Sequence, residues 1–149
     1  MFEKFTENGR KAFAIANREA QRFHHEGVET EHVLLGLIKE GESVTLQIFK
    51  ALDVDLKNLK LQCQKVGQVA HEKGDVEKMP QSPQIQHVVK YAVDEARQLK
   101  HSVVGSEHIL LGLIRETDGA ASVLLAKQGV SAENVRDTII KLCPHAETV

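Results

Sequence analysis

Aromatic residues are scarce in this chain, and tryptophan is absent. Only 4% of its 149 residues are Phe, Tyr or Trp, whereas Ala, Leu, Glu, Lys and Gln are frequent. This balance favours helix, because aromatic and β-branched side chains are the ones that pack best in strands. No stretch alternates apolar and polar residues over enough positions to indicate a strand. The composition predicts an all-α fold.

The chain also lacks the cysteine spacing of a disulfide framework or a zinc site. Its two cysteines, Cys63 and Cys143, form no CxxC motif. We expect two reduced, largely buried thiols in a cytoplasmic protein. The opening residues MFEKFTENGRK contain no signal-peptide core, and no apolar run approaches the roughly 18 residues of a membrane helix. No membrane partner is expected.

Signatures of several other functional classes are missing as well. The net charge is −2, from 19 basic and 21 acidic residues without a block of one sign, so a nucleic-acid partner is not indicated. The sequence contains no GxxxxGK[ST], GxGxxG or GxSxG motif, which excludes a P-loop, a dinucleotide fingerprint and a nucleophile elbow. We expect a binding domain without catalytic residues or a cofactor.

What the chain does contain is an internal repeat. TEHVLLGLIKE occupies residues 30–40 and SEHILLGLIRE occupies 106–116, and eight of these eleven positions are identical. A constant shift of 76 residues, the separation of Thr30 and Ser106, keeps about 6–64 in register with about 82–140 without a gap. Two copies are too few for a solenoid. A pseudo-twofold pair of repeats that share one core is expected instead.

Each repeat is predicted to hold four helices, because apolar residues recur with helical spacing between capping residues. The third helix is expected at 43–52 and 119–128, ending at Asp53 and Gly129 in left-handed conformation. The other helices are expected to begin at Thr6, Thr30 and Asp55 in the first repeat, and at Ser82, Ser106 and Ser131 in the second.

The predicted architecture is one domain, 1–149, with about eight helices. Repeat one covers 2–66, a polar linker covers 67–81 and repeat two covers 82–143. Gly36 and Gly112 fall at the same place in the second helix of each repeat. Since Gly inside a helix costs about 1 kcal/mol relative to Ala, we expect close helix packing there.

The repeated Glu-His pair supplies the chemical candidates. Glu31 and Glu107 are expected at the first position of their helices, where a carboxylate is stabilised by roughly 0.3–1 kcal/mol. The alternative is a carboxylate displayed at a surface junction, able to accept a guanidinium in bidentate fashion. His32 and His108 are interpreted as packed or capping groups. A metal site, built for example from His32 with nearby histidines and Glu31, is disfavoured because the spacing matches no known metal motif.

These residues carry a resemblance to a known family. FTENGRKAFAIANREAQ, TEHVLLGLIKEGE and VDEARQLKHSVVGSEHILLGLIRE resemble the amino-terminal domain of the Clp ATPases, most of all the ClpC type. The resemblance covers about residues 2–143, and the doubled [ST]EH[VI]LLGLI[KR]E motif is highly specific. It implies an all-helical domain of two four-helix repeats, which docks adaptors and protein substrates for the ATPase and peptidase rings of a Clp machine.

The resemblance also implies a ligand and a site. Some ClpC-type domains recognise phosphorylated arginine at two symmetry-related sites, whose acidic residues correspond to Glu31 and Glu107. The remaining expected site residues lie at helix starts: Thr6 and Ser82 toward the phosphate, and Thr30 and Ser106 beside the acids. Where the family commonly has a basic residue two positions after the Thr, this chain has Asn8 and Gln84. Docking of an adaptor or an unfolded segment does not need that charge.

Two other functions stay open at the level of sequence. One is a stand-alone homologue of the Clp amino-terminal domain that acts as an accessory regulator of a Clp complex. The other is a metallohydrolase, suggested only by the eight histidines.

Overall fold

The computed structural model describes residues 4–22, 27–40, 44–68 and 83–142. Within these ranges the helices are α1 (Glu7–Arg22), α2 (Thr30–Glu40), α3 (Val44–Ala51), α4 (Leu56–Gln68), α5 (Pro83–Gln98), α6 (Ser106–Arg115), α7 (Ala120–Lys127) and α8 (Ala132–Leu142). The described residues form no strand, only isolated bridges such as the parallel one between Phe5 and Val104. The all-α prediction is confirmed. No helix in this part of the chain is long and apolar enough to cross a membrane.

Local capping chemistry fixes most helix ends where the sequence predicts them. The side-chain oxygens of Thr6, Asp55 and Ser131 each accept the amide hydrogen of the residue three positions on, at 3.1 Å. Asp53 and Gly129 end the third helix of each repeat with positive φ, 60° and 79°. Ser82 and Cys143 lie outside the described residues. The helix α4 runs to Gln68, so the division at residue 66 stays a prediction.

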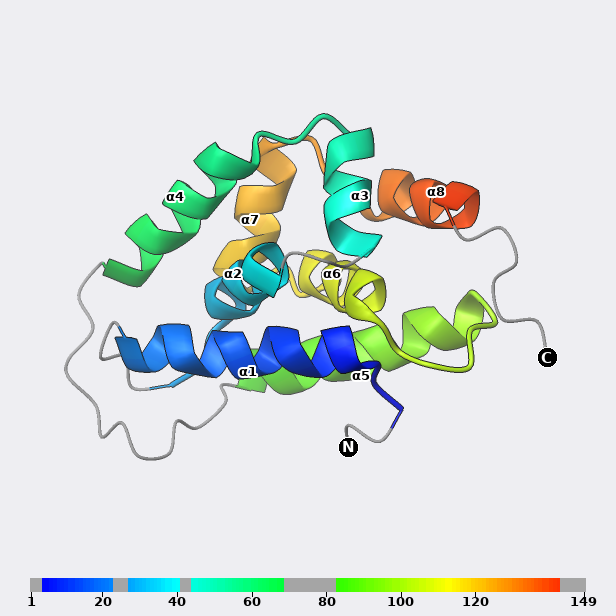
Figure 1. Cartoon of the computed structure of the whole chain (residues 1–149), viewed down its shortest axis with the longest axis horizontal. Coiled ribbons are helices and arrows are strands. Elements are labelled where there is room, and N and C mark those ends of the chain that lie inside the picture. The colour runs from blue at the N-terminus through cyan, green and yellow to red at the C-terminus, as the bar shows by residue number, and fades with distance from the viewer. Residues whose placement is uncertain (1–3, 23–26, 41–43, 69–82, 143–149) are drawn as a thin grey trace.

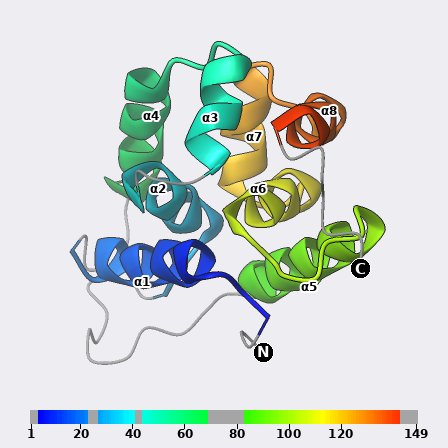
Figure 2. The same cartoon turned by 45° about the vertical axis from the view of Figure 1, so that its right-hand side comes forward.

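The helices stack in three layers (Figures 1 and 2). In these views α1 and α5 form the lower layer, α2 and α6 the middle one, and α3, α4, α7 and α8 the upper one. The middle helices are covered on most sides, so Val33 to Leu37 and Ile109 to Leu113 are all buried. Burying these aliphatic side chains supplies the main driving force for the fold.

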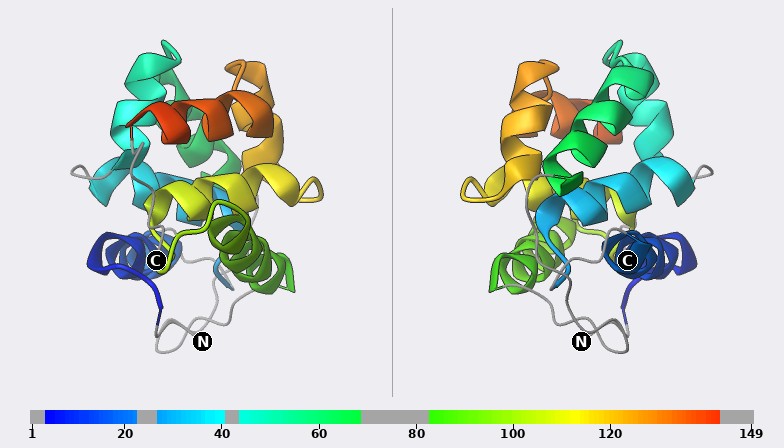
Figure 3. Two further views of the ribbon diagram at one scale, coloured as in Figure 1. Left: turned by 90° about the vertical axis from the view of Figure 1, so that its right-hand side faces the viewer. Right: turned by 90° about the vertical axis from the view of Figure 1, so that its left-hand side faces the viewer.

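The two repeats interlock instead of folding as separate bodies. Helix α3 of the first repeat contacts α6 and α8 of the second, while α4 contacts α7 as well as its own α2. Figure 3, which views the molecule from two opposite sides, shows α8 above α6 on one side and α4 above α2 on the other. This is the expected pseudo-twofold arrangement around a shared core.

Gly36 and Gly112 bring helix backbones into contact. A Cβ added to Gly36 would stand 2.1 Å from the carbonyl oxygen of Ala12, and one on Gly112 would stand 2.5 Å from that of Val88. These oxygens belong to α1 and α5, so each middle helix presses its glycine against the lower helix of its own repeat. The predicted packing role of both glycines is confirmed.

We expect Gly36→Ala to destabilise the domain by about 1–3 kcal/mol, because the new methyl group overlaps a backbone atom that cannot rotate away. Urea unfolding followed by circular dichroism measures the change. Gly9→Ala is the matched control. Its Cβ would meet neighbours no closer than 3.4 Å, so its stability should be unchanged or higher by up to about 1 kcal/mol. Equal unfolding midpoints for the two variants would contradict the backbone contact.

Candidate functional site

The repeated Glu-His pair lies in the first turns of α2 and α6. These helices begin with Thr30 and Ser106, the residues at which the sequence predicts their starts. Gly105 is the N-cap residue of α6, with extended backbone. Glu107 is therefore the second residue of its helix, as Glu31 is of α2, and not the first. Both carboxylates remain within the turn where a helix favours negative charge.

The histidine of each pair caps the amino-terminal end of its helix. The ring Nδ1 of His108 accepts the Gly105 amide at 2.8 Å, and the ring Nδ1 of His32 accepts the Glu29 amide at the same distance. Both histidines occupy the third helical position, where a Glu or Gln usually makes this bond. Because the ring accepts the amide of the N-cap residue, that residue needs no capping side chain of its own. The interpretation of His32 and His108 as capping groups is confirmed.

A second ring extends this bond in repeat two. His108 Nε2 and His101 Nδ1 are 2.7 Å apart. Since His108 Nδ1 accepts a hydrogen bond, the ring proton of the neutral form sits on Nε2 and is donated to His101. Burial first, and then the charge of His101, lower the pKa of His108 to about 3, against the opposing effect of Glu95. His108 is neutral at physiological pH.

These rings and Glu107 form the one group of potential metal ligands in the described part of the chain, with their atoms within 4.8 Å of one another. Hydrogen-bond accounting disfavours a metal there. A metal bound through His108 Nε2 would require a proton on Nδ1. That proton would point at the Gly105 amide hydrogen, which Nδ1 now accepts. The cluster is explained better as a neutral hydrogen-bonded pair beside a carboxylate.

The two acidic candidates have different surroundings. Glu31 is only 4% exposed. A carboxylate displayed at the surface, the alternative raised by the sequence, would be more exposed than this. The pKa of the free thiol of Cys63 is raised to about 12, first by the burial of the thiol and then by the negative charge of Glu31. Glu107 is half-buried, and burial raises its pKa while a bond from its own backbone amide opposes the shift. Its carboxylate lies over Gly105, where an added Cβ would stand 2.4 Å from Oε1.

The start of α1 lies beside the Glu107 segment, although the two come from different repeats. The Thr6 amide donates to the Val104 carbonyl at 2.8 Å, and the Val104 amide donates to the Lys4 carbonyl at 2.8 Å. The hydroxyl of Thr6 caps α1 through the Gly9 amide. The expected site residues Thr6 and Glu107 therefore share one edge of the molecule. This composite arrangement was not evident from the sequence.

The hydroxyl residues of the repeated motif are buried. Thr30 is 1% exposed, and its Oγ1 accepts the Ala121 amide at the start of α7 at 3.2 Å. Ser106 is 2% exposed. Thr30 thus links the two repeats. Direct contact of Thr30 and Ser106 with a ligand stays a prediction.

A buried ion-pair network was missed at the level of sequence. Glu95 of α5, 1% exposed, accepts bonds from Arg136 Nε at 3.0 Å and Nη2 at 2.8 Å, and from Arg115 at 2.9 Å. The bonds from Arg136 hold the pKa of Glu95 below its usual value, with burial opposing. Glu19, at the same register in repeat one, binds Lys39 at 2.9 Å. The sequence signal that could have revealed this network is that Glu19 and Glu95 align in the repeat and both lie between apolar positions of a helix face.

Comparison with known proteins places this fold in a family. A model of the Clp repeat (R) N-terminal domain matches residues 4–128 and 81–149. The chain belongs to this family. The chloroplastic chaperone protein ClpC1 of Oryza sativa subsp. japonica is 38% identical over 143 residues, which make up 95% of this chain and 15% of the rice protein. The chain thus spans only a small part of its full-length relatives.

Solved structures agree with the family fold. The N-terminal domain of Hsp104 from Candida albicans has a TM-score of 0.81 at 19% identity, covering 98% of this chain and 95% of that one. A ClpV N-domain solved in complex with a VipB peptide has a TM-score of 0.68 at 17% identity, covering 99% and 92%. The expected resemblance to the amino-terminal domain of the Clp ATPases is confirmed.

Acid should destabilise the domain through His108. Its folded pKa is about 3, below the unfolded value of roughly 6.5, so the unfolded state binds more protons between these values and stability falls as the pH decreases. We expect this group to account for a loss of about 2–3 kcal/mol between pH 7 and pH 4.5 in urea unfolding. His108→Gln keeps an acceptor for the Gly105 amide but does not titrate, so its loss should be smaller by that amount. Parallel pH profiles would refute the role of His108.

The Glu95 network should contribute measurably to stability. Arg136→Ala removes two bonds from a buried carboxylate, and we expect unfolding to become easier by about 2 kcal/mol. Arg97→Ala is the control, because Arg97 is 77% exposed in its pair with Asp94 and should contribute less than about 0.5 kcal/mol. Thermal and urea unfolding of both variants test this, and a cost no larger than that of the control would show that Arg115 alone satisfies Glu95.

Proposed function

We propose that this chain docks adaptors and protein substrates for a Clp-type ATP-dependent unfoldase and protease complex. The proposal is supported by membership of the Clp repeat family and by the solved complex of a ClpV N-domain with a VipB peptide. The sequence contains no GxxxxGK[ST] motif, so nucleotide hydrolysis would come from other modules of such a complex. A reduced cytoplasmic setting is proposed with it, in agreement with the free, buried Cys63.

The observation that carries this proposal is the edge shared by Glu107 and the start of α1. A carboxylate that lies partly buried at a helix start can accept the N–H groups of a guanidinium in bidentate geometry. The first turn of α1 lies at the same edge, and the amino-terminal turn of a helix favours an anion. The Thr6 hydroxyl accepts from Gly9 and retains its own hydrogen for donation. A ligand with a guanidinium at one end and a phosphate at the other suits this pair.

We therefore propose phosphoarginine on a protein segment as a ligand. A phosphate on the guanidinium adds about −1.5 to −2 charge next to a group that still donates hydrogen bonds. Unmodified arginine would satisfy only the carboxylate. The difference in affinity between phosphoarginine and arginine therefore tests the assignment directly.

A fluorescein-labelled peptide with one phosphoarginine should bind at least about tenfold more tightly than the same peptide with arginine, because only the former uses the start of α1. Fluorescence anisotropy measures both affinities. The double variant Glu31→Gln/Glu107→Gln should weaken the binding of both peptides, because both use the carboxylates, while retaining a cooperative unfolding transition. Equal affinity of the wild-type chain for both peptides would remove phosphoarginine from the proposal, and the adaptor would remain to be tested by pull-down with an adaptor protein.

A further inference from the structure

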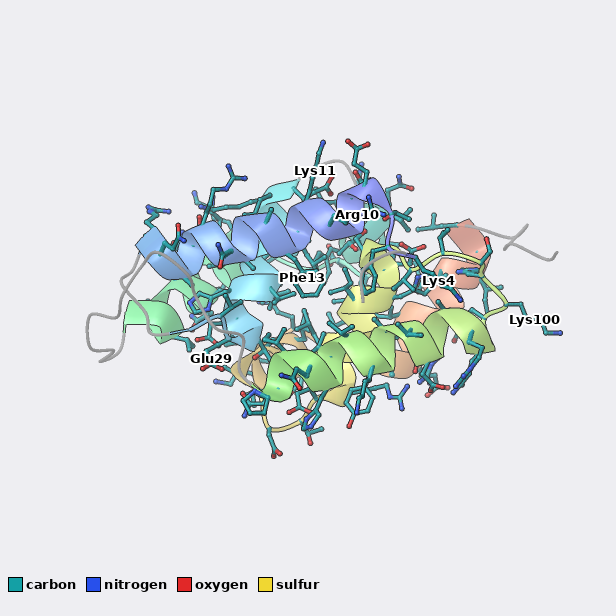
Figure 4. The ribbon with its side chains drawn as sticks, turned by 90° about the horizontal axis from the view of Figure 1, so that it is seen from below. Lys4, Arg10, Lys11, Phe13, Glu29 and Lys100 are labelled. Carbon is teal, nitrogen blue, oxygen red and sulfur yellow. The ribbon has the colours of Figure 1, made fainter. Side chains whose placement is uncertain are left out.

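Charged side chains are distributed unevenly along the lower layer. Figure 4 labels Lys4, Arg10 and Lys100 toward one end of the pair formed by α1 and α5, and Glu29 toward the other end. The three cations are exposed, and Glu29 is half-buried. We call these the basic end and the Glu29 end. Glu7 in the first turn of α1 belongs to the basic end, and Arg22 in its last turn belongs to the Glu29 end.

The basic end coincides with the edge that contains Glu107. The Lys4 carbonyl accepts the Val104 amide at 2.8 Å, and Arg10 lies in the first turns of α1, its amide bonded to the Thr6 carbonyl at 2.9 Å. Lys100 lies in the connection that leads from α5 to α6 and thus to Glu107. Two different repeats contribute these charges to one edge.

The repeat register identifies the counterparts at the second expected site, which combines Glu31 with the start of α5. The positions that correspond to the three cations are Pro80, Gln86 and His24. Neither Pro nor Gln carries a charge, and His is mostly neutral at pH 7. The second site thus lacks permanent positive charge at all three equivalent positions.

The Glu29 end adds a second difference. Glu29 occupies the position in repeat one that Gly105 occupies in repeat two, directly before the repeated motif. Glu29 therefore places a carboxylate beside the Glu31 segment, where it would repel a phosphate. The two equivalent positions differ by a full negative charge, and Glu31 itself is the more deeply buried acid.

We propose that a phosphorylated guanidinium ligand occupies one site per chain, the site formed by Glu107, Lys4 and Arg10, and that the Glu31 site does not bind it. This inference rests on the proposed function. Both sites offer a carboxylate for the guanidinium, so the phosphate end decides between them. The basic residues Lys4 and Arg10 at the first site take the place of the missing positive charge at Asn8. The duplicated motif thus supports one phosphoryl site in this chain.

Isothermal titration calorimetry with free phosphoarginine tests the stoichiometry. We expect one equivalent to bind per chain. Glu107→Gln should abolish binding, whereas Glu31→Gln should leave the affinity within about twofold, with the fold of each variant checked by thermal unfolding. Two equivalents, or loss of binding in Glu31→Gln alone, would overturn this inference and leave the proposed ligand intact. A wild-type chain that binds no phosphoarginine would overturn both.

Exchanging charged residues between the repeats tests whether charge is what separates the two sites, and it leaves Glu31 and Glu107 unchanged. Arg10→Gln, which copies Gln86, should weaken binding about tenfold, because one charge-assisted contact to phosphate is lost. The reciprocal double variant Glu29→Gly/Gln86→Arg should create a second binding equivalent. Glycine is tolerated at an N-cap, so this variant should fold. A double variant that still binds a single equivalent would contradict charge as the property that separates the sites.

Discussion

The positions of Glu31 and Glu107 depend on the contact between helix backbones at Gly36 and Gly112. At these positions α2 and α6 press against the carbonyl groups of α1 and α5. This contact sets the height of each middle helix above the lower one. It also sets where the first turns of α2 and α6 emerge, and with them Glu31 and Glu107. A larger residue would lift the middle helices and move the acids relative to the lower layer.

The interlocked packing explains why a duplicated sequence forms one domain. Each repeat covers part of its upper helices with the other repeat, because α3 contacts α6 and α8, and α4 contacts α7 in addition to its own α2. The same exchange joins Thr6 to the Val104 segment. A binding edge built from two repeats follows from this topology. Because each edge combines residues from both copies, divergence of either copy changes the edges unequally.

Much of the architecture could be predicted from sequence because its signals are local. The caps at Thr6, Asp55 and Ser131, and the left-handed residues Asp53 and Gly129, act within a few residues of themselves. The starts of α2 and α6 at Thr30 and Ser106 were predicted too, but Glu31 and Glu107 were expected at the first helical position and occupy the second. There a histidine ring accepts the amide of the residue before the helix, so Thr30 and Ser106 belong to the helices and do not cap them.

The candidate site was less accessible to sequence reasoning because its parts meet only through tertiary packing. The identity of Glu31 and Glu107 in the repeat gives no sign of their different burial, which depends on neighbouring helices. The pairing of Arg136 with Glu95 joins α8 to α5 across 41 residues. Likewise, the placement of Lys4 beside Val104 required the fold itself.

The bridge between Phe5 and Val104 also has a consequence for synthesis on the ribosome. Phe5 finds its partner Val104 only after the ribosome has added 99 further residues. Until then the start of α1 has no backbone partner from the second repeat, and α3 lacks its contacts with α6 and α8. A nascent chain halted before residue 104 would therefore expose apolar surfaces that the folded domain buries.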